Sequence, residues 1–225
     1  MSMFEGQLIH ILDTETTGLP HQKGSHVIEI GIATIRVGEG IVSTYESMLC
    51  PPSLDSEAIK VAEQIHGIGK EQILSSRPFR DVWNEVASYI NQNPGPWTAW
   101  NVPFDRTMIR KTFLGLNDYT DIPERLNVPP EVLSHSKMGW PEHFDREEDK
   151  SPWTWCVMHA YSRMRPTRGH TRSWYTRSLE PNFWSLADAA KKEEIAFEGN
   201  AHRALTDARV AAQICERMLL NALKD

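Results

Sequence analysis

The chain has 225 residues, of which 40% are hydrophobic and 24% are charged. This length can bury a sizeable core, so we expect a single domain over residues 1–225. No apolar run approaches the length of a membrane helix and no secretory signal is visible, which argues against a membrane protein or a membrane partner. The net charge of -6 argues against broad, non-specific binding of nucleic acid.

The cysteines are three in number and widely spaced, at Cys50, Cys156 and Cys215. An odd, scattered set has neither the spacing of zinc ligands nor that of a disulfide framework. We therefore expect a reducing compartment and a cytoplasmic location.

An acidic pair follows the first expected strand. Residues 8–12 are apolar, which predicts a buried strand, and Asp13 and Glu15 come at its end. Side chains at positions i and i+2 of a strand point to the same face, so both carboxylates can reach one site. Residues 16–20 predict a turn. Alone, this piece also fits a pair of surface acids at a strand end.

A hairpin and two helices are expected next. Residues 27–35 and 41–45 predict paired strands, with a turn at residues 38–40. Residues 57–65 and 79–90 have helical periodicity. This order of elements favours an α/β fold, with a mixed sheet covered by helices.

A third carboxylate is expected near the start of a helix. Residues 96–100 predict a short strand, after which Asn101 is a good N-cap and Pro103 is tolerated in the first turn. Asp105 then lies early in the helix, on the face of Asn101. The alternative is that Asn101 only caps the helix and Asp105 is an acid favoured by the helix dipole.

Two segments interrupt the periodic pattern, and we expect insertions or long loops at about residues 115–151 and 164–181. Between them, residues 153–158 predict a return to the sheet before a helix that runs through Arg163. The second segment mixes arginines with aromatic residues, among them Arg168, Arg172 and Trp174. Such a mixture suits single-stranded nucleic acid, although a solvated loop with Trp174 packed beneath it is the alternative.

The last helix has a core face of small and apolar residues at helical spacing, which are Ala204, Ala208, Ala211, Cys215, Met218 and Ala222. A regular helix would turn His202 and Asp207 well apart. We therefore place His202 in the loop or first turn before the helix and Asp207 within it. Alone, the pair also fits a solvated histidine and a surface acid.

Together these pieces resemble the DEDDh branch of the DnaQ-like 3′–5′ exonuclease superfamily. The resemblance depends on order and context: strand-Asp-x-Glu, then Asn-x-x-x-Asp, then His-x-x-x-x-Asp at a C-terminal helix. It extends from about Leu8 to Leu220. The element Gln64-Ile65-His66-Gly67-Ile68 also fits, since that family often has His-Gly-Ile next to the terminal nucleotide.

The resemblance implies a ribonuclease H-like α/β fold, a mixed sheet flanked by helices. It implies two Mg²⁺ or Mn²⁺ ions held by Asp13, Glu15, Asp105 and Asp207, with His202 as the general base. Candidates for gripping the terminal nucleotide are Thr16, Gly18, Leu19, Ile65 and His66. Asn101 is expected to shape the site rather than to bind metal, and Arg168, Arg172 and Trp174 to bind the substrate strand.

The implied activity is hydrolysis of nucleic-acid 3′ ends to nucleoside 5′-monophosphates, with DNA slightly favoured. An RNA-trimming exoribonuclease is one alternative, and a catalytically silent nucleic-acid-binding module on the same fold is another. The expected partner is nucleic acid with a free 3′ end. A polymerase partner and self-association stay open.

Overall fold

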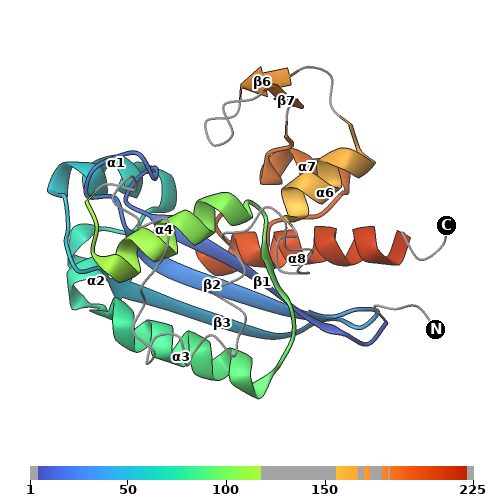
Figure 1. Ribbon diagram of the computed structural model, residues 1–225, viewed down its shortest axis with the longest axis horizontal. Coiled ribbons are helices and arrows are strands. Elements are labelled where there is room, and N and C mark those ends of the chain that lie inside the picture. The colour runs from blue at the N-terminus through green and yellow to red at the C-terminus, as the bar shows by residue number, and fades with distance from the viewer. Residues whose placement is uncertain (1–4, 118–155, 167–169, 173–178, 182, 222–225) are drawn as a thin grey trace.

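The molecule is built around a mixed five-stranded sheet (Figure 1). This computed structural model describes residues 5–117, 156–166, 170–172, 179–181 and 183–221. The strand order is β4-β3-β2-β1-β5. The strands are β1 (Leu8–Thr16), β2 (Val27–Arg36), β3 (Gly40–Cys50), β4 (Arg77–Pro78) and β5 (Trp97–Ala99). β1, β2 and β3 are antiparallel neighbours, whereas β5 is parallel to β1 and β4 is parallel to β3.

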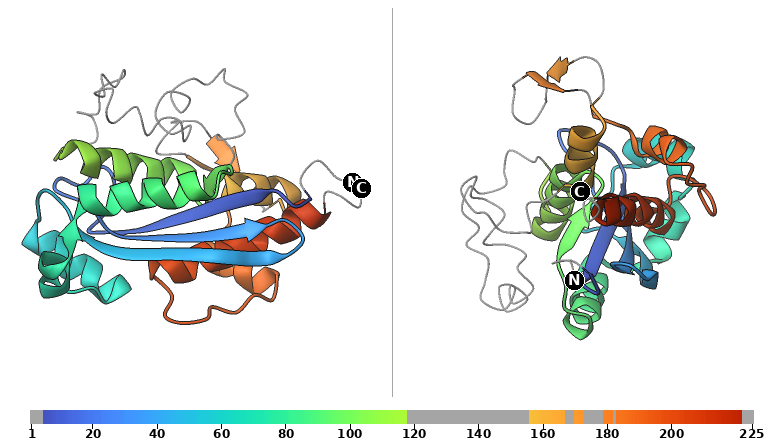
Figure 2. Two further views of the ribbon diagram at one scale, coloured as in Figure 1. Left: turned by 90° about the horizontal axis from the view of Figure 1, so that it is seen from below. Right: turned by 90° about the vertical axis from the view of Figure 1, so that its right-hand side faces the viewer.

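Helices cover both faces of the sheet (Figure 2). On one face lie α3 (Phe79–Gln92) and α4 (Val102–Leu114), and on the other lies α8 (Ala204–Asn221). Two shorter helices, α6 (Val157–Met164) and α7 (Leu186–Lys192), pack beside α8. α1 (Ser56–His66) and α2 (Lys70–Ser75) lie together at one end of the sheet (Figure 1). Within the described part of the chain, no helix is long and apolar enough to cross a membrane.

The alternation of side chains along β1 explains this layering. Ile9 and Ile11 are buried in the core formed with α8, whereas Leu12 is buried in the core formed with α3 and α4. A strand points successive side chains to opposite faces, and both faces here are apolar because each is covered by a helix. The predicted buried strand is therefore confirmed.

Most of the expected elements are present. The hairpin is confirmed, with β3 continuing to Cys50, and the helices expected at residues 57–65 and 79–90 correspond to α1 and α3. The sequence pattern did not anticipate α2, α7 or β4. Of the strand expected at residues 153–158, residues 153–155 lie outside the described residues, and the expectation is wrong at its end, because α6 begins at Val157. Val157 and Tyr161 are both buried one helical turn apart, so helical packing decides this stretch.

The two expected interruptions lie largely or partly outside the described residues. Of residues 115–151, only 115–117 are described. Within residues 164–181 the structure contains a small antiparallel pair, β6 (His170–Arg172) and β7 (Leu179–Pro181). The assignment of residues 1–225 to a single domain stays a prediction.

Candidate metal and catalytic site

Three carboxylates converge where β1 meets α8. Asp13 and Glu15 lie on the face of β1 that carries Ile9 and Ile11, and Asp207 lies in the first turn of α8. One ligand oxygen from each of Asp13, Glu15 and Asp207 lies within 4.8 Å of the others. The expectation that these three residues share one site agrees with this geometry.

Asp105 reaches the same region from the opposite face of β1. Thr14 lies between the two acids, so its side chain points toward α4, and its hydroxyl donates a 2.8 Å hydrogen bond to Oδ1 of Asp105. Asp105 is 4% exposed, and its charge raises the pKa of Asp13. Asp105 is therefore a neighbour of the three-residue cluster, fixed by a threonine that sequence reasoning missed.

β2 allows α8 to approach the sheet closely. Gly31 is the cross-strand partner of Asp13, and a Cβ at this glycine would overlap the backbone of Ala204 and Leu205. The glycine is required by backbone packing rather than by a turn. This contact sets Asp207, one turn further along α8, beside Asp13.

A second residue of β2, Glu29, holds the start of α8. It is the cross-strand partner of Glu15 and is fully buried. Its Oε2 accepts a 2.9 Å hydrogen bond from the backbone N–H of Ala204, and its carboxylate also pairs with Arg203. Sequence reasoning treated Glu29 only as part of a strand. A buried acid within an otherwise apolar run was the available signal.

Burial and mutual repulsion raise the pKa values of the clustered carboxyls. Burial, followed by the charges of Asp105, Glu15 and Asp207, raises the pKa of Asp13 well above its ordinary value. Burial and the charge of Asp207 raise the pKa of Glu15 to about 8, and burial raises the pKa of Asp105 to about 7. Burial also raises the pKa of Asp207, although nearby His202 opposes this shift. The charged carboxylates of the cluster therefore lack enough positive charge nearby to stabilise them.

The donor set fits hard divalent cations. All four groups offer carboxylate oxygens, the ligands that Mg²⁺ and Mn²⁺ prefer. Oδ1 of Asp207 is buried and has no hydrogen-bond partner among the residues that the structure describes. A buried acceptor without a donor is costly unless a ligand satisfies it.

His202 lies just ahead of α8, as the sequence predicts. Its side chain is exposed, and its backbone has φ 63°, in the left-handed region that residues other than glycine seldom adopt. This conformation separates His202 from the helical path, so it and Asp207 can face the same site.

The candidate residues for the terminal nucleotide lie near one end of the sheet, at the end of β1, in the loop that follows it and in α1 (Figure 1). Leu19 and Ile65 are 50% and 59% exposed, so both apolar side chains are accessible to a ligand. The hydroxyl of Thr16 donates to the carbonyl of Gly18 at 2.9 Å. His66 is buried, and its Nδ1 accepts a hydrogen bond from the backbone N–H of Ile68.

Lys111 of α4, which sequence reasoning did not single out, holds this loop in place. The lysine is fully buried, and its ammonium donates to the carbonyls of Pro20 and Gln22 and to the hydroxyl of Ser25. The helix that carries Asp105 therefore also fixes the loop with Gly18 and Leu19. A lysine at a buried helical position was the sequence signal.

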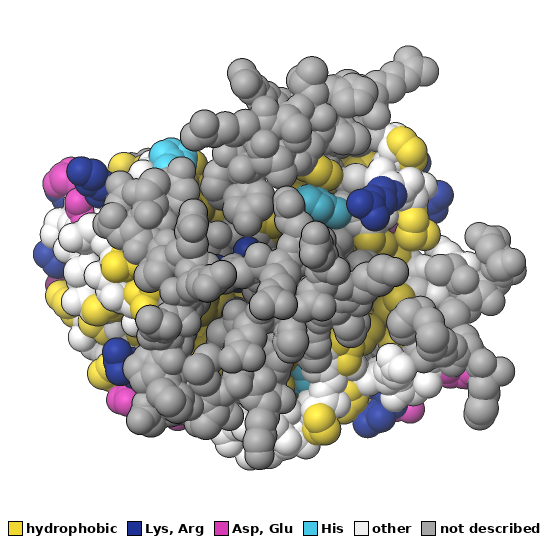
Figure 3. Space-filling model, in the orientation of Figure 1, with side chains coloured by type: hydrophobic (Ala, Val, Ile, Leu, Met, Phe, Trp, Pro, Cys, Tyr) yellow, Lys and Arg dark blue, Asp and Glu magenta, His cyan; other side chains and the backbone are white. Residues whose placement is uncertain are grey.

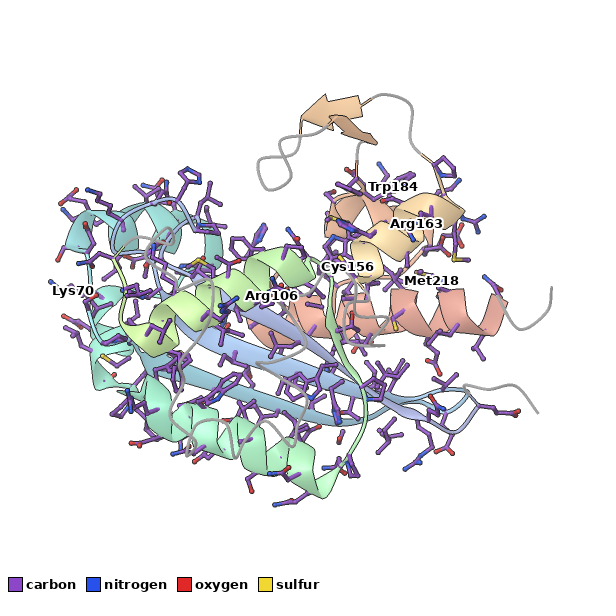
Figure 4. The ribbon with its side chains drawn as sticks, in the orientation of Figure 1. Lys70, Arg106, Cys156, Arg163, Trp184 and Met218 are labelled. Atoms are coloured by element: carbon purple, nitrogen blue, oxygen red, sulfur yellow. The ribbon has the colours of Figure 1, made fainter. Side chains whose placement is uncertain are left out.

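Asn101 occupies the N-cap position of α4, but its side chain makes no capping hydrogen bond. The helix instead begins with hydrogen bonds from the backbone N–H groups of Phe104 and Asp105 to the carbonyl of Asn101. In Figure 4, Arg106 marks this part of α4 and Cys156 marks the start of α6. The thiol of Cys156 donates to the carbonyl of Trp100, which ties the start of α6 to the turn between β5 and Asn101.

The predicted arginine-rich contact is only partly described. Arg168 and Trp174 lie outside the described residues, and Arg172 lies in β6 without a described side chain. At the edge of this segment, Arg163 and Arg165 are exposed at the end of α6, and Figure 3 shows basic side chains at this place. Arg165 pairs with Glu193 at 3.6 Å, and its carbonyl accepts from the indole of Trp184.

The mixed sheet with helices on both faces is a ribonuclease H-like α/β fold. Solved structures share it. A full-length 3′-exonuclease aligns with a TM-score of 0.65 at 15% identity, over 97% of this chain and 62% of that one. The nuclease domain of 3′hExo, a DEDDh family member bound to rAMP, aligns with a TM-score of 0.61 at 15% identity, over 98% and 95% of the two chains.

The family follows from the sequence comparison. The exonuclease family model RNase_T matches residues 10–128, and the chain belongs to this family. A curated relative, the PolC-type DNA polymerase III of Thermotoga petrophila, is 31% identical over 119 residues. That match covers 52% of this chain but only 8% of the polymerase. The resemblance to the DnaQ-like exonuclease superfamily is confirmed.

Proposed function

We propose that this chain is a metal-dependent 3′–5′ exonuclease that hydrolyses nucleic-acid 3′ ends to nucleoside 5′-monophosphates. The observation that carries the proposal is the convergence of Asp13, Glu15 and Asp207, with ligand oxygens within 4.8 Å of one another. Asp105 and His202 adjoin this cluster. Membership of the exonuclease family supports the reaction class.

Asp13, Glu15, Asp105 and Asp207 would hold two Mg²⁺ or Mn²⁺ ions. When bound, such ions lower the pKa of a water and stabilise the charge on the attacking and leaving oxygens of the phosphate. The fit depends on the oxygen-only donor set, on the raised carboxyl pKa values, which a nearby cation would reverse, and on the unsatisfied Oδ1 of Asp207.

His202 is the proposed general base. Its imidazole takes a proton from the attacking water, the role that a positioned histidine most often plays in general acid–base catalysis. The new bond forms between the water oxygen and phosphorus, and the bond from phosphorus to the 3′ oxygen of the preceding nucleotide breaks. The terminal nucleotide leaves as a 5′-monophosphate, and the released 3′ oxygen takes a proton from solvent water to give a new 3′-OH.

DNA is the proposed substrate. The relative at 31% identity is named a DNA polymerase, and the structure of Exonuclease X, with a TM-score of 0.56 at 18% identity, has duplex DNA bound. An RNA substrate is the second candidate, because the structure of a further 3′-exonuclease, with a TM-score of 0.64 at 15% identity, concerns a histone mRNA stem-loop. The exposed Leu19 and Ile65 suit contact with a base of either kind. A cytoplasmic location stays a prediction from the cysteines.

The test is a digestion of 5′-labelled single-stranded DNA, duplex DNA and RNA, side by side, with Mg²⁺. We expect stepwise shortening from the 3′ end, release of 5′-monophosphates and complete inhibition by EDTA. Asp13→Asn should abolish the reaction, whereas Asp81→Asn, at an exposed acid in the first turn of α3, should not. No released nucleotide from any substrate would favour the silent binding module.

A further inference from the structure

We propose that Glu29 is a positioning residue for His202, an inference that rests on the proposed exonuclease function. Glu29 itself reaches no substrate in this scheme. It anchors the two residues that directly follow His202, and it thereby fixes the backbone from which the imidazole projects.

The contacts of Glu29 are those of a fixed anchor. Its fully buried carboxylate accepts from the backbone N–H of Ala204 at 2.9 Å and from Nη2 of Arg203 at 2.5 Å. Nε of Arg203 lies 3.1 Å from both carboxylate oxygens. Charge-assisted bonds from a planar guanidinium are strong and directional, so Arg203 and Ala204 have little freedom.

The backbone of His202 needs such an anchor. With φ 63°, this histidine adopts a conformation that costs free energy for any residue with a Cβ. A residue stays in that region only when its surroundings determine it. Arg203 and Ala204 provide this constraint on the C-terminal side of His202, because both are bonded to the buried Glu29.

The register of the sheet links the anchor to the carboxylate cluster. Glu29 lies opposite Glu15 on β1, and Gly31 lies opposite Asp13. On the same face of β2, Glu29 therefore anchors the start of α8, and Gly31 leaves room for its backbone. Together the two residues fix how closely α8 approaches the sheet and where the helix begins relative to the acids of β1.

A neighbouring acid provides a matched control. Glu46 of β3 approaches the same guanidinium at 3.9 Å, but it is 40% exposed and the structure gives it no bond to Ala204. If charge near Arg203 were sufficient, Glu46 and Glu29 would be equivalent. If the hydrogen bonds to the backbone of Ala204 and to the guanidinium of Arg203 are required, only the substitution of Glu29 should change the rate that depends on His202.

The experiment is a double-mutant cycle between Glu29→Gln and His202→Ala. Glutamine keeps the shape of the side chain but gives up one acceptor oxygen. We expect kcat to fall about 10²-fold, the scale of a small misplacement of a catalytic group, with KM little changed. Glu46→Gln should stay close to wild type. All variants are assayed at saturating Mg²⁺, so that altered metal affinity does not enter the comparison.

The coupling decides the outcome. If Glu29 acts through His202, Glu29→Gln should cost much less in the His202→Ala background than in wild type. Equal losses in both backgrounds, or a full rate in Glu29→Gln, would overturn the inference. If Glu29→Gln does not fold, Arg203→Lys replaces it in the same cycle. Lysine keeps the positive charge but cannot make the paired hydrogen bonds of the guanidinium. Inactive wild-type protein would instead refute the proposed function, and the inference would fall with it.

Discussion

At the scale of single residues, the side chains of Asp13, Thr14 and Glu15 point alternately toward two helices on opposite faces of the sheet. The two acids point toward α8 and meet Asp207, whereas Thr14 points toward α4 and donates to Asp105. The twofold period of the strand makes this division unavoidable. Thr14 is therefore the link by which a carboxylate on one face of the sheet is fixed beside carboxylates on the other.

Thr14→Val tests this link, because valine keeps the shape of threonine and lacks its hydroxyl. Without the 2.8 Å hydrogen bond, the orientation of Asp105 is no longer fixed. Groups that orient metal ligands typically contribute about 10- to 100-fold in affinity, so we expect half-maximal activity to need that much more Mg²⁺. Thr44→Val, at an exposed position of β3, is the control. An unchanged Mg²⁺ dependence would show that Thr14 does not support the site.

The raised carboxyl pKa values predict how stability changes with pH. Glu15 titrates at about 8 in the folded protein, against an ordinary value of 4.5. Between these values the folded state holds a proton that the unfolded state releases, so the free energy of unfolding falls as the pH rises. We expect the metal-free protein to lose stability between about pH 4.5 and 8.

Urea denaturation across this range, with EDTA or with Mg²⁺, measures the effect. Mg²⁺ should restore stability most at the alkaline end, because cations favour the charged carboxylates. Glu15→Gln should reduce the slope. A metal-free wild-type protein whose stability has the same pH slope as that of Glu15→Gln would contradict this account.

At the scale of elements, the packing of α8 on β2 decides the geometry of the site. Gly31 leaves room for the backbone of Ala204 and Leu205, and no side chain with a Cβ fits there without movement. The helix cannot shift without carrying Asp207 away from Asp13.

Gly31→Ala should therefore reduce both stability and activity. Overpacking against backbone typically costs about 1–3 kcal/mol, and we expect a loss at the upper end of this range in denaturation experiments. Gly69→Ala is the control, because its new methyl group would meet the end of the flexible Glu63 side chain. Wild-type activity and stability in Gly31→Ala would show that α8 is not held by this contact.

The sequence predicts β1, the β2–β3 hairpin and the helices α1, α3, α4 and α8, because each has a clear period or cap. It does not predict α2, with 6 residues, α7, with 7, or β4, with 2, since so short a stretch has no period to detect. The strand expected at residues 153–158 is wrong at Val157 and Met158, because a short apolar run fits a buried helix as well.

The residues of the candidate site also fall into a group that the sequence indicates and a group that it does not. Local patterns predict where Asp13, Glu15, Asp105, Asp207 and His202 lie in their strand, helices and loop. Their assignment to one site comes from the order of the three pieces and from the family resemblance. The roles of Thr14, Gly31 and Glu29 depend on contacts between distant segments. Glu29 and Ala204 are 175 positions apart, and no local pattern reports such a pair.

At the scale of the whole molecule, a chain with a net charge of -6 must attract a polyanion locally. The carboxylate cluster alone would repel phosphate, so binding should depend on the cations held there and on nearby basic side chains. The binding of nucleic acid should therefore depend on the binding of metal ions at the same end of the sheet.

The most direct measurement compares one single-stranded DNA of fixed sequence in linear and in circular form, with Mg²⁺ and purified protein. An enzyme that removes nucleotides from a 3′ end has nowhere to begin on a circle. We predict steady release of 5′-monophosphates from the linear strand and none from the circle over the same time. Cleavage of the circle at the rate of the linear strand would contradict the assignment as a 3′–5′ exonuclease.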